Sequence, residues 1–279
     1  MKQIVKSIVK PVVSYGSQKA ALFKLGQLDK SLIFVEPLFK TLCDEVSNVE
    51  KNSILQIERR RKELLNSKKT FEFIDFGTGF KGDGGATVKV EKPVSSAASW
   101  SRSPFWSLFL FHLVRRLNPK VCLEMGSCVG ISGSYMASAL SLNERDGVLT
   151  TLEGCEDLAL ITSQTFERLK LNNAKVVSGT FDKTLDQALS GQGPFDFAYV
   201  DGNHSYEATV NYHKKLKAQA NGQPLTLVFD DIHWSAGMKK AWSEIYNDQD
   251  VKISLDLRGF GLCFINFKEK KQHYNIPIV

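Results

Sequence analysis

Three aspartates and one histidine stand where two apolar runs of the chain end. The segment FDFAYVDGNH closes with Asp201 and His204, and the segment LVFDD closes with Asp230 and Asp231. Carboxylates at the ends of neighbouring strands repel one another unless a cation binds them, and oxygen ligands suit Mg²⁺ or a similar hard ion. Histidine can accept a proton near neutral pH. We therefore predict a Mg²⁺ site at the three aspartates, with a general base beside it.

Simpler interpretations of these residues exist. Asp230 and Asp231 could form a turn or an N-cap pair before a helix near Gly237. His204 could cap a helix that starts at Tyr206, and His233 competes with it as base or as substrate contact. The two aspartate segments favour chemistry mainly because they occur together with a second motif.

That second motif is a glycine-rich turn. In VCLEMGSCVGISG an apolar run ends at Glu124, and Gly126 and Gly130 follow, four residues apart. Short apolar runs are typical of buried parallel strands, and a glycine turn that leads into a helix lets a ligand approach bare backbone N–H groups. This pattern predicts a nucleotide-cofactor site. The dinucleotide fingerprint GxGxxG would need glycine in place of Cys128, so NAD is the second choice.

Glu153 ends the next apolar run, nearly 30 residues beyond Glu124. An ionised carboxylate has two acceptor oxygens, so it can bind both hydroxyls of a ribose. The alternative is a carboxylate beside a helix N-terminus, a position that Glu156 and Asp157 would share.

The order of the elements predicts an α/β protein. Residues 1–100 read as a helical extension that ends in a glycine-rich loop, and residues 101–279 alternate strand and helix, which indicates a parallel sheet with crossover helices. We expect strands at residues 121–124, 148–152, 174–177, 195–200, 225–229, 252–257 and 260–267. The last two, joined by Arg258 and Gly259, read as an antiparallel hairpin.

The pattern ExGxxxGxS, together with VDGNH and FDD, resembles the class I S-adenosylmethionine-dependent methyltransferases, and most of all their metal-dependent O-methyltransferases of the catechol and sugar type. The resemblance covers about residues 100–267. It implies a Rossmann-like sheet of order 3-2-1-4-5-7-6 with strand 7 antiparallel. It also implies S-adenosylmethionine as methyl donor, a small-molecule hydroxyl as acceptor, and Mg²⁺ as the bound ion. Asp231 departs from the Asn that many members carry.

The resemblance also implies roles for individual residues. His204 would be the base, with Asp201 as its catalytic neighbour and a metal ligand. The glycines would admit the methionine part of the cofactor, Ser132 would bind its carboxylate, and Thr180 and Phe181 would flank the adenine. The complete set of expected cofactor contacts is Glu124, Gly126, Ser127, Gly130, Ser132, Glu153, Thr180, Phe181 and Asp201.

Composition sets outer limits. The chain has 279 residues, 43% hydrophobic and 24% charged, so it can bury a large core. No stretch of about 18 apolar residues occurs, which argues against a membrane span. Five cysteines without a CxxC pair indicate reduced thiols and a cytoplasmic location. A net charge of +6 permits an anionic partner, but the basic residues are scattered, so nucleic acid is not indicated.

Two rival functions stay open, as do several roles outside the motifs. The rival enzyme is a nucleic-acid methyltransferase, which the positive net charge favours weakly. The rival without catalysis is a scaffold protein that binds the cofactor but has lost the methyl-transfer chemistry. Assembly into a homo-oligomer is also open.

Three further features lie outside the motifs. Residues 75–85, with Lys81 and Asp83, read as a lid or as an exposed connection. Residues 1–14 read as an amphipathic helix that packs on the protein's own core, with contact to a membrane surface as the alternative. The aromatic residues Trp100, Phe105, Trp106 and Trp234 could line an acceptor pocket or belong to the core.

Overall fold

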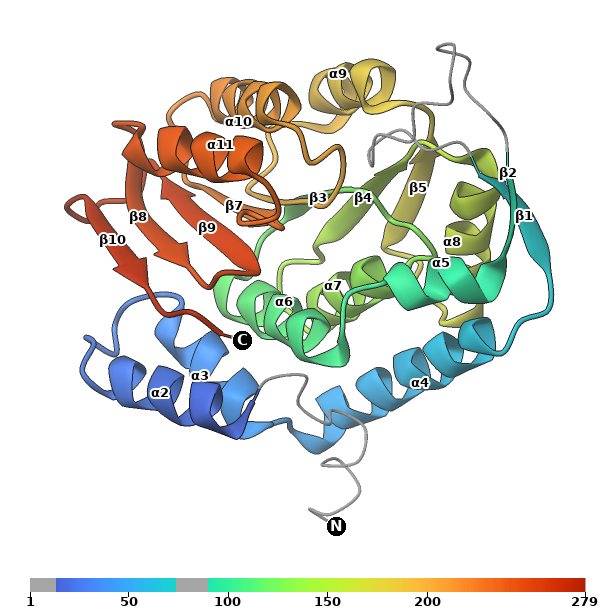
Figure 1. The fold of residues 1–279 in the computed structure, drawn as a ribbon, viewed down its shortest axis with the longest axis horizontal. Coiled ribbons are helices and arrows are strands. Elements are labelled where there is room, and N and C mark those ends of the chain that lie inside the picture. The colour runs from blue at the N-terminus through green and yellow to red at the C-terminus, as the bar shows by residue number, and fades with distance from the viewer. Residues whose placement is uncertain (1–13, 74–89, 279) are drawn as a thin grey trace.

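A computed structural model describes residues 14–73 and 90–278 of the chain. A twisted central sheet has helices on both of its faces, and the N-terminal helices form a further layer below one of these (Figure 1). The elements before the main sheet are α2 (Tyr15–Gly26), α3 (Val35–Cys43), α4 (Asn48–Leu65), β1 (Thr70–Phe73), β2 (Val90–Pro93), α5 (Val94–Trp100) and α6 (Pro104–Leu117).

The second part of the chain alternates strand and helix. Its elements are β3 (Val121–Met125), α7 (Ile131–Ser141), β4 (Val148–Glu153), α8 (Glu156–Arg168), β5 (Ala174–Ser178), α9 (Phe181–Gln192), β6 (Phe197–Val200), α10 (Tyr206–Ala220), β7 (Leu225–Asp230), α11 (Ala236–Asn247), β8 (Val251–Asp256), β9 (Phe260–Ile265) and β10 (Gln272–Asn275).

The main sheet has the order β10-β8-β9-β7-β6-β3-β4-β5. The strands from β3 to β7 pair in parallel, and β9 pairs antiparallel with both β7 and β8. When β3 to β9 are numbered 1 to 7, this is the predicted order 3-2-1-4-5-7-6 with strand 7 antiparallel. The predicted fold class is therefore confirmed. β10 adds an edge strand, parallel to β8, that the sequence did not predict.

Alternation of side chains along the strands builds a core on each face of the sheet. In β6, Phe197 and Tyr199 point into a core shared with α6, α7 and α8, whereas Ala198 and Val200 point into a core shared with α9, α10 and α11. Successive residues of a strand face opposite sides, so a strand with helices on both faces must be apolar throughout. The continuous apolar runs in the sequence follow from this burial.

The N-terminal helices pack on the sheet domain. α3 contacts α6, and α4 contacts both α5 and α7, so the buried side chains of these helices join the core on the α6–α8 face. A capping box fixes the start of α4, because Ser47 accepts a hydrogen bond from the Glu50 N–H and Glu50 accepts one from the Ser47 N–H. The division into residues 1–100 and 101–279 stays a prediction.

Two predicted features lie wholly or largely outside the described residues. They are the helix at residues 1–14 and the glycine-rich loop at residues 75–85 with Lys81 and Asp83. The strands β1 and β2 that flank the loop pair in antiparallel register, with Phe73 opposite Val90. Among the helices that the structure describes, none combines the length and the hydropathy needed to cross a bilayer.

Candidate active site at the carboxyl edge of the sheet

The parallel strands β3 to β7 all end at one edge of the sheet, which we call the carboxyl edge. The backbone there is joined from strand to strand: the Asp201 N–H donates to the Met125 carbonyl at 2.8 Å, and the Gly126 N–H donates to the Leu152 carbonyl at 2.9 Å. Open α/β sheets bind ligands beyond this edge, where the strand order reverses. In this sheet the reversal lies between β3 and β6.

Two glycines of the turn after β3 are required by the protein's own packing. Gly126 has φ +100°, and a Cβ placed on it would lie 1.9 Å from the Asp201 carbonyl oxygen. Gly130 has φ +82°, and a Cβ there would lie 3.2 Å from the Cα of Thr162 in α8. A side chain at Gly126 would meet backbone atoms that cannot move aside cheaply, and one at Gly130 would be strained by its positive φ. Their predicted contact with a cofactor stays a prediction.

Glu153 lies against the glycine turn. Its Oε2 accepts the Cys128 N–H at 2.8 Å and the Ser127 hydroxyl at 3.4 Å, and its Oε1 accepts the Cys155 N–H at 3.0 Å. The residue is 8% exposed, and burial raises the pKa of its carboxyl while these donors oppose the rise. The Ser127 hydroxyl also bonds that of Thr162 at 3.1 Å. The acidic residue predicted to bind ribose is thus next to the predicted cofactor turn.

Glu124 is fully buried at the end of β3. Its Oε1 accepts the Ser132 hydroxyl at 2.6 Å, and its Oε2 has no hydrogen-bond partner among the described residues. Burial raises the pKa of this carboxyl to about 7. The Ser132 hydroxyl has one proton, and it donates that proton to Glu124. In this arrangement the hydroxyl has no proton left to donate to a cofactor carboxylate, which is the contact predicted for Ser132.

Thr180 and Phe181 follow β5 at the same edge. Thr180 is the N-cap of α9 without a side-chain cap bond. Phe181 packs edge-on against Tyr212, with ring centroids 6.0 Å apart, and its ring would lie 2.8 Å from a Cβ on Gly202. Gly202 directly follows Asp201, so Phe181 is close to the end of β6. Half-buried, it has both a core contact and a solvent-facing part.

Asp201 and Asp230 lie close together at the ends of β6 and β7. The Tyr199 hydroxyl is 2.9 Å from Asp201 Oδ2 and 3.1 Å from Asp230 Oδ2. Asp230 also accepts the Asp231 N–H at 2.7 Å. The N-cap interpretation of this pair is wrong, because Ser235 caps α11. Because β6 and β7 are parallel neighbours, their ends lie side by side, and Asp201 and Asp230 are close together as predicted.

A cation from elsewhere in the chain lies among these carboxylates. Arg102, between α5 and α6, bonds both oxygens of Asp230, and its Nη2 lies 2.6 Å from Asp231 Oδ1. Burial lowers the pKa of Arg102, but Asp230 and the other acidic groups outweigh it and the pKa is raised. Burial and Asp201 raise the pKa of Asp230, and Arg102 opposes that rise. The side chain of Asp230 is 0% exposed, so its charge needs this partner.

The aspartates do not fit a Mg²⁺ ion in this arrangement. Mg²⁺ demands nearly octahedral oxygen ligands at about 2.0–2.1 Å. Here the guanidinium bonds the oxygens of Asp230 and Asp231 that such an ion would need. Within residues 14–73 and 90–278, no group of three or more His, Cys, Asp or Glu side chains is arranged to hold a metal ion. Of the predicted ligands, Asp230 and Asp231 bond Arg102. Asp201 is linked to Asp230 through the Tyr199 hydroxyl.

Two histidines border the site. His204 Nε2 is 3.6 Å from Asp201 Oδ1, with its side chain 20% exposed. The capping interpretation of His204 is wrong, because Ser205 caps α10. His233 Nε2 lies 2.8 Å from Asp256 Oδ2, which also accepts the Trp242 indole N–H. His204 is therefore the histidine beside the predicted catalytic aspartate.

The aromatic residues divide between core and surface. Phe105 is buried, and Trp106 packs on Phe260 with ring centroids 4.6 Å apart. Trp100 and Trp234 are 46% and 72% exposed. Trp234 lies in a segment that leaves the carboxyl edge, three residues after Asp231.

Sequence reasoning did not find Arg102 or Tyr199. Arg102 stands 128 residues before Asp230, in a segment without a motif. Tyr199 stands within an apolar run and so reads as an ordinary strand residue; in the structure its ring is buried. The available signal was charge: clustered buried carboxylates require a counter-cation, which can be a side chain as well as a metal ion.

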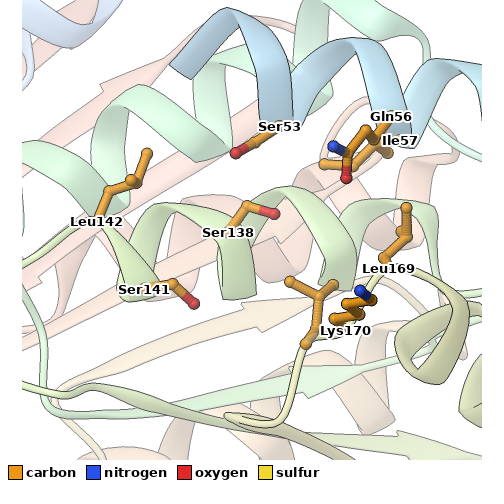
Figure 2. A pocket seen from close by; sticks show the side chains of 9 residues that line it. Ser53, Gln56, Ile57, Ser138, Ser141, Leu142, Leu169 and Lys170 are labelled. Carbon is orange, nitrogen blue, oxygen red and sulfur yellow. The ribbon is translucent and has the colours of Figure 1, made fainter. Parts of the chain in front are cut away.

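A separate pocket of about 190 Å³ lies between α4 and α7 (Figure 2). It is lined by Ser53, Gln56, Ile57, Ser138, Ser141, Leu142, Leu169, Lys170 and Leu171. The lining segments that follow α7 and α8 lead into the starts of β4 and β5. The pocket therefore lies toward the opposite edge of the sheet from the carboxylates.

Comparison with known proteins gives two sequence matches. A family model described as a methyltransferase domain matches residues 123–232, which span β3 to the end of β7. A protein of Arabidopsis thaliana with the provisional name caffeoyl-CoA O-methyltransferase is 24% identical over 163 residues, 58% of this chain and 64% of that protein. The chain thus spans slightly less than two thirds of the length of this relative.

Solved structures resemble the fold. An O-methyltransferase from Bacillus cereus in complex with SAH gives a TM-score of 0.51 at 22% identity, covering 59% of this chain and 82% of that one. An SAH-bound methyltransferase from Podospora anserina gives a TM-score of 0.53 at 15% identity, covering 79% of this chain and 88% of that one. At these identities the likeness concerns the Rossmann-like architecture.

Proposed function

We propose that this chain transfers a methyl group from S-adenosylmethionine to a hydroxyl of a small molecule. The match of residues 123–232 to a family model described as a methyltransferase domain supports the proposal. The observation that carries the proposal is the contact of Glu153 with the glycine turn, where Oε2 accepts the Cys128 N–H at 2.8 Å. This contact brings a carboxylate suited to ribose hydroxyls next to the turn that leads into α7.

The cofactor would lie across the ends of β3, β4 and β5. Glu153 would bind the ribose, and Thr180 and Phe181 would flank the adenine. The turn from Gly126 to Gly130, which includes Ser127, would contact the methionine part of the cofactor. Glu124 and Ser132 lie behind this turn as a hydrogen-bonded buried pair. The half-buried position of Phe181 near Gly202 supports a ring that contacts ligand and core together.

The acceptor would lie over the end of β6. Its hydroxyl oxygen attacks the methyl carbon, the carbon–sulfur bond breaks with its electron pair going to sulfur, and the hydroxyl proton goes to His204. A neutral alcohol is a poor nucleophile, so a base must take this proton in or before the transition state. The partial exposure of His204 and the distance of 3.6 Å between its Nε2 and Asp201 Oδ1 support this role.

The sequence also predicted that methyl transfer depends on Mg²⁺. The carboxylates that would hold Mg²⁺ bond Arg102 instead, so we assign no step of the reaction to an ion. Cytoplasmic location and assembly into a homo-oligomer stay predictions.

One experiment tests the proposed function in two stages. Isothermal titration calorimetry with S-adenosylmethionine is expected to give one site per chain, and methyl-labelled cofactor is then incubated with a panel of catechols, sugars and phenolic acids. Label in an ether product supports the proposal. Binding without transfer to any hydroxyl would favour a scaffold. Transfer to RNA with a steep salt dependence would favour the nucleic-acid enzyme.

A further inference from the structure

The cluster of Asp201, Asp230 and Asp231 has one cationic partner in direct contact among the residues that the structure describes, the guanidinium of Arg102, apart from His204 at 3.6 Å. Asp230 receives four donors: the Arg102 Nε and Nη2, the Tyr199 hydroxyl and the Asp231 N–H. Every one of them donates to the carboxylate, and these bonds oppose the rise in its pKa that burial and Asp201 cause.

The backbone of Arg102 is anchored as firmly as its side chain. Its carbonyl accepts Arg61 Nη1 at 2.7 Å and the Ser107 hydroxyl at 3.3 Å. Arg61 is 7% exposed and bonds Glu58 at 2.9 Å. α4 therefore fixes the segment that carries Arg102 over the carboxyl edge. A side chain that had merely folded into an open metal site would not need this support.

An aromatic wall completes the surroundings of the guanidinium. Arg102 Cζ lies 5.7 Å from the centroid of the fully buried Phe260 ring, and Tyr199 packs on the same ring at 5.6 Å. Guanidinium groups stack on aromatic faces and match carboxylates through a planar fork of donors. The side chain is 21% exposed, so these groups do not enclose it completely.

We propose that Arg102, and not a divalent metal ion, is the resident cation of this carboxylate cluster, and that it is a positioning residue that holds Asp230 and Asp231 in place beside Asp201. The catalytic meaning of this assignment rests on the proposed methyl transfer, but the assignment of the cation does not. A methyl transfer supported in this way would keep its rate in the presence of a chelator.

The first test measures metal binding in the full chain without cofactor or acceptor. Mn²⁺ serves as the probe, and its free electron paramagnetic resonance signal is followed as protein is added. Wild type is expected to deplete the signal no more than Asp230→Asn does. Stoichiometric Mn²⁺ binding by wild type that is lost in Asp230→Asn would overturn the proposal, because the guanidinium would then have given way to an ion.

The second test is a double-mutant cycle on thermal stability with Arg102→Met, Asp230→Asn and the double variant. Removal of one partner of a buried ion pair is expected to lower the Tm on the order of 10 °C, because the remaining charge stays buried and unpaired. The double variant, with both charges removed, is expected to lose far less than the sum of the single losses. Additive losses would overturn the proposal.

A matched arginine and a conservative variant complete the design. Arg145→Met removes an exposed ion pair, at 3.8 Å from Asp196, and is expected to leave the Tm almost unchanged. Arg102→Lys keeps the charge and is expected to retain more stability than Arg102→Met. If Arg102→Met does not fold, folding of the double variant supports the coupling, and failure of both overturns it. None of these results depends on whether methyl transfer occurs.

Discussion

Glu124 and Ser132 form a buried pair in which the serine hydroxyl donates to one carboxyl oxygen at 2.6 Å while the other oxygen, Oε2, lacks a hydrogen-bond partner among the described residues. A Cβ on Gly133 would lie 2.7 Å from that second oxygen. The start of α7 is therefore closed tightly over Glu124. A buried carboxyl with one unbonded oxygen is more stable when it carries a proton.

This pair gives a pH-dependent prediction for Glu124→Gln. Burial raises the pKa of Glu124 to about 7 in the folded protein, above its value in the unfolded chain of about 4.3. Its contribution is therefore fully present below the unfolded pKa and is lost as pH rises through the folded pKa. Relative to Glu124→Gln, the free energy of unfolding of wild type should fall by about 2–3 kcal/mol between pH 4.5 and pH 7.5.

Urea unfolding followed by circular dichroism at several pH values measures this difference. Glutamine keeps the shape of the side chain and does not titrate, so contributions from other groups cancel. Parallel stability curves for the two proteins would show that Glu124 stays ionised in the fold.

A second prediction concerns Gly126→Ala. The new methyl group would meet the Asp201 carbonyl at 1.9 Å, at a φ of +100° that alanine rarely adopts. Strain at this φ costs on the order of 1–3 kcal/mol before the clash is added, so the unfolding free energy should fall by about 3 kcal/mol or more. The matched control is Gly191→Ala in α9, where a Cβ meets nothing within 4 Å and stability should rise by about 0.5–1 kcal/mol. Chemical denaturation distinguishes the two.

The sheet was predictable because its signals are local. Strands buried on both faces appear as apolar runs, and the glycine turn and the carboxylates come directly after such runs. The sheet order 3-2-1-4-5-7-6 is confirmed, and residues 123–232 match a family model described as a methyltransferase domain. β10 was missed because Gln272–Asn275 is a mostly exposed polar edge strand, fixed by pairing with β8 rather than by its own composition.

The electrostatics of the site were only half predictable. The positions of Asp201 and Asp230 followed from strand ends, whereas the partner of Asp230 depends on tertiary packing. The Arg102 segment reaches the carboxyl edge because α4 holds its backbone through Arg61. No periodicity in the sequence encodes that contact, which joins the predicted N-terminal extension to the sheet domain.

A third prediction tests the proposed ribose contact. Glu153→Gln replaces an ionised acceptor with a neutral amide, so affinity for S-adenosylmethionine should fall about 10- to 100-fold, as expected for the loss of charge-assisted hydrogen bonds. The control is Glu156→Gln in the first turn of α8, an exposed carboxylate nearby. Calorimetric titration measures both variants. An equal affinity in Glu153→Gln and Glu156→Gln would remove Glu153 from the cofactor site.

The fourth prediction decides between the two histidines. His204→Gln should lower kcat for methyl transfer about 10²- to 10⁴-fold, the usual contribution of a general base. The Kd for S-adenosylmethionine should stay within a few-fold, since His204 lies at the end of β6 beyond the glycine turn. His233→Gln should affect kcat much less, because His233 Nε2 is bonded to Asp256, which Trp242 also contacts. A kcat loss confined to His233→Gln would instead make the His233–Asp256 pair the base, with His204 serving only to contact Asp201.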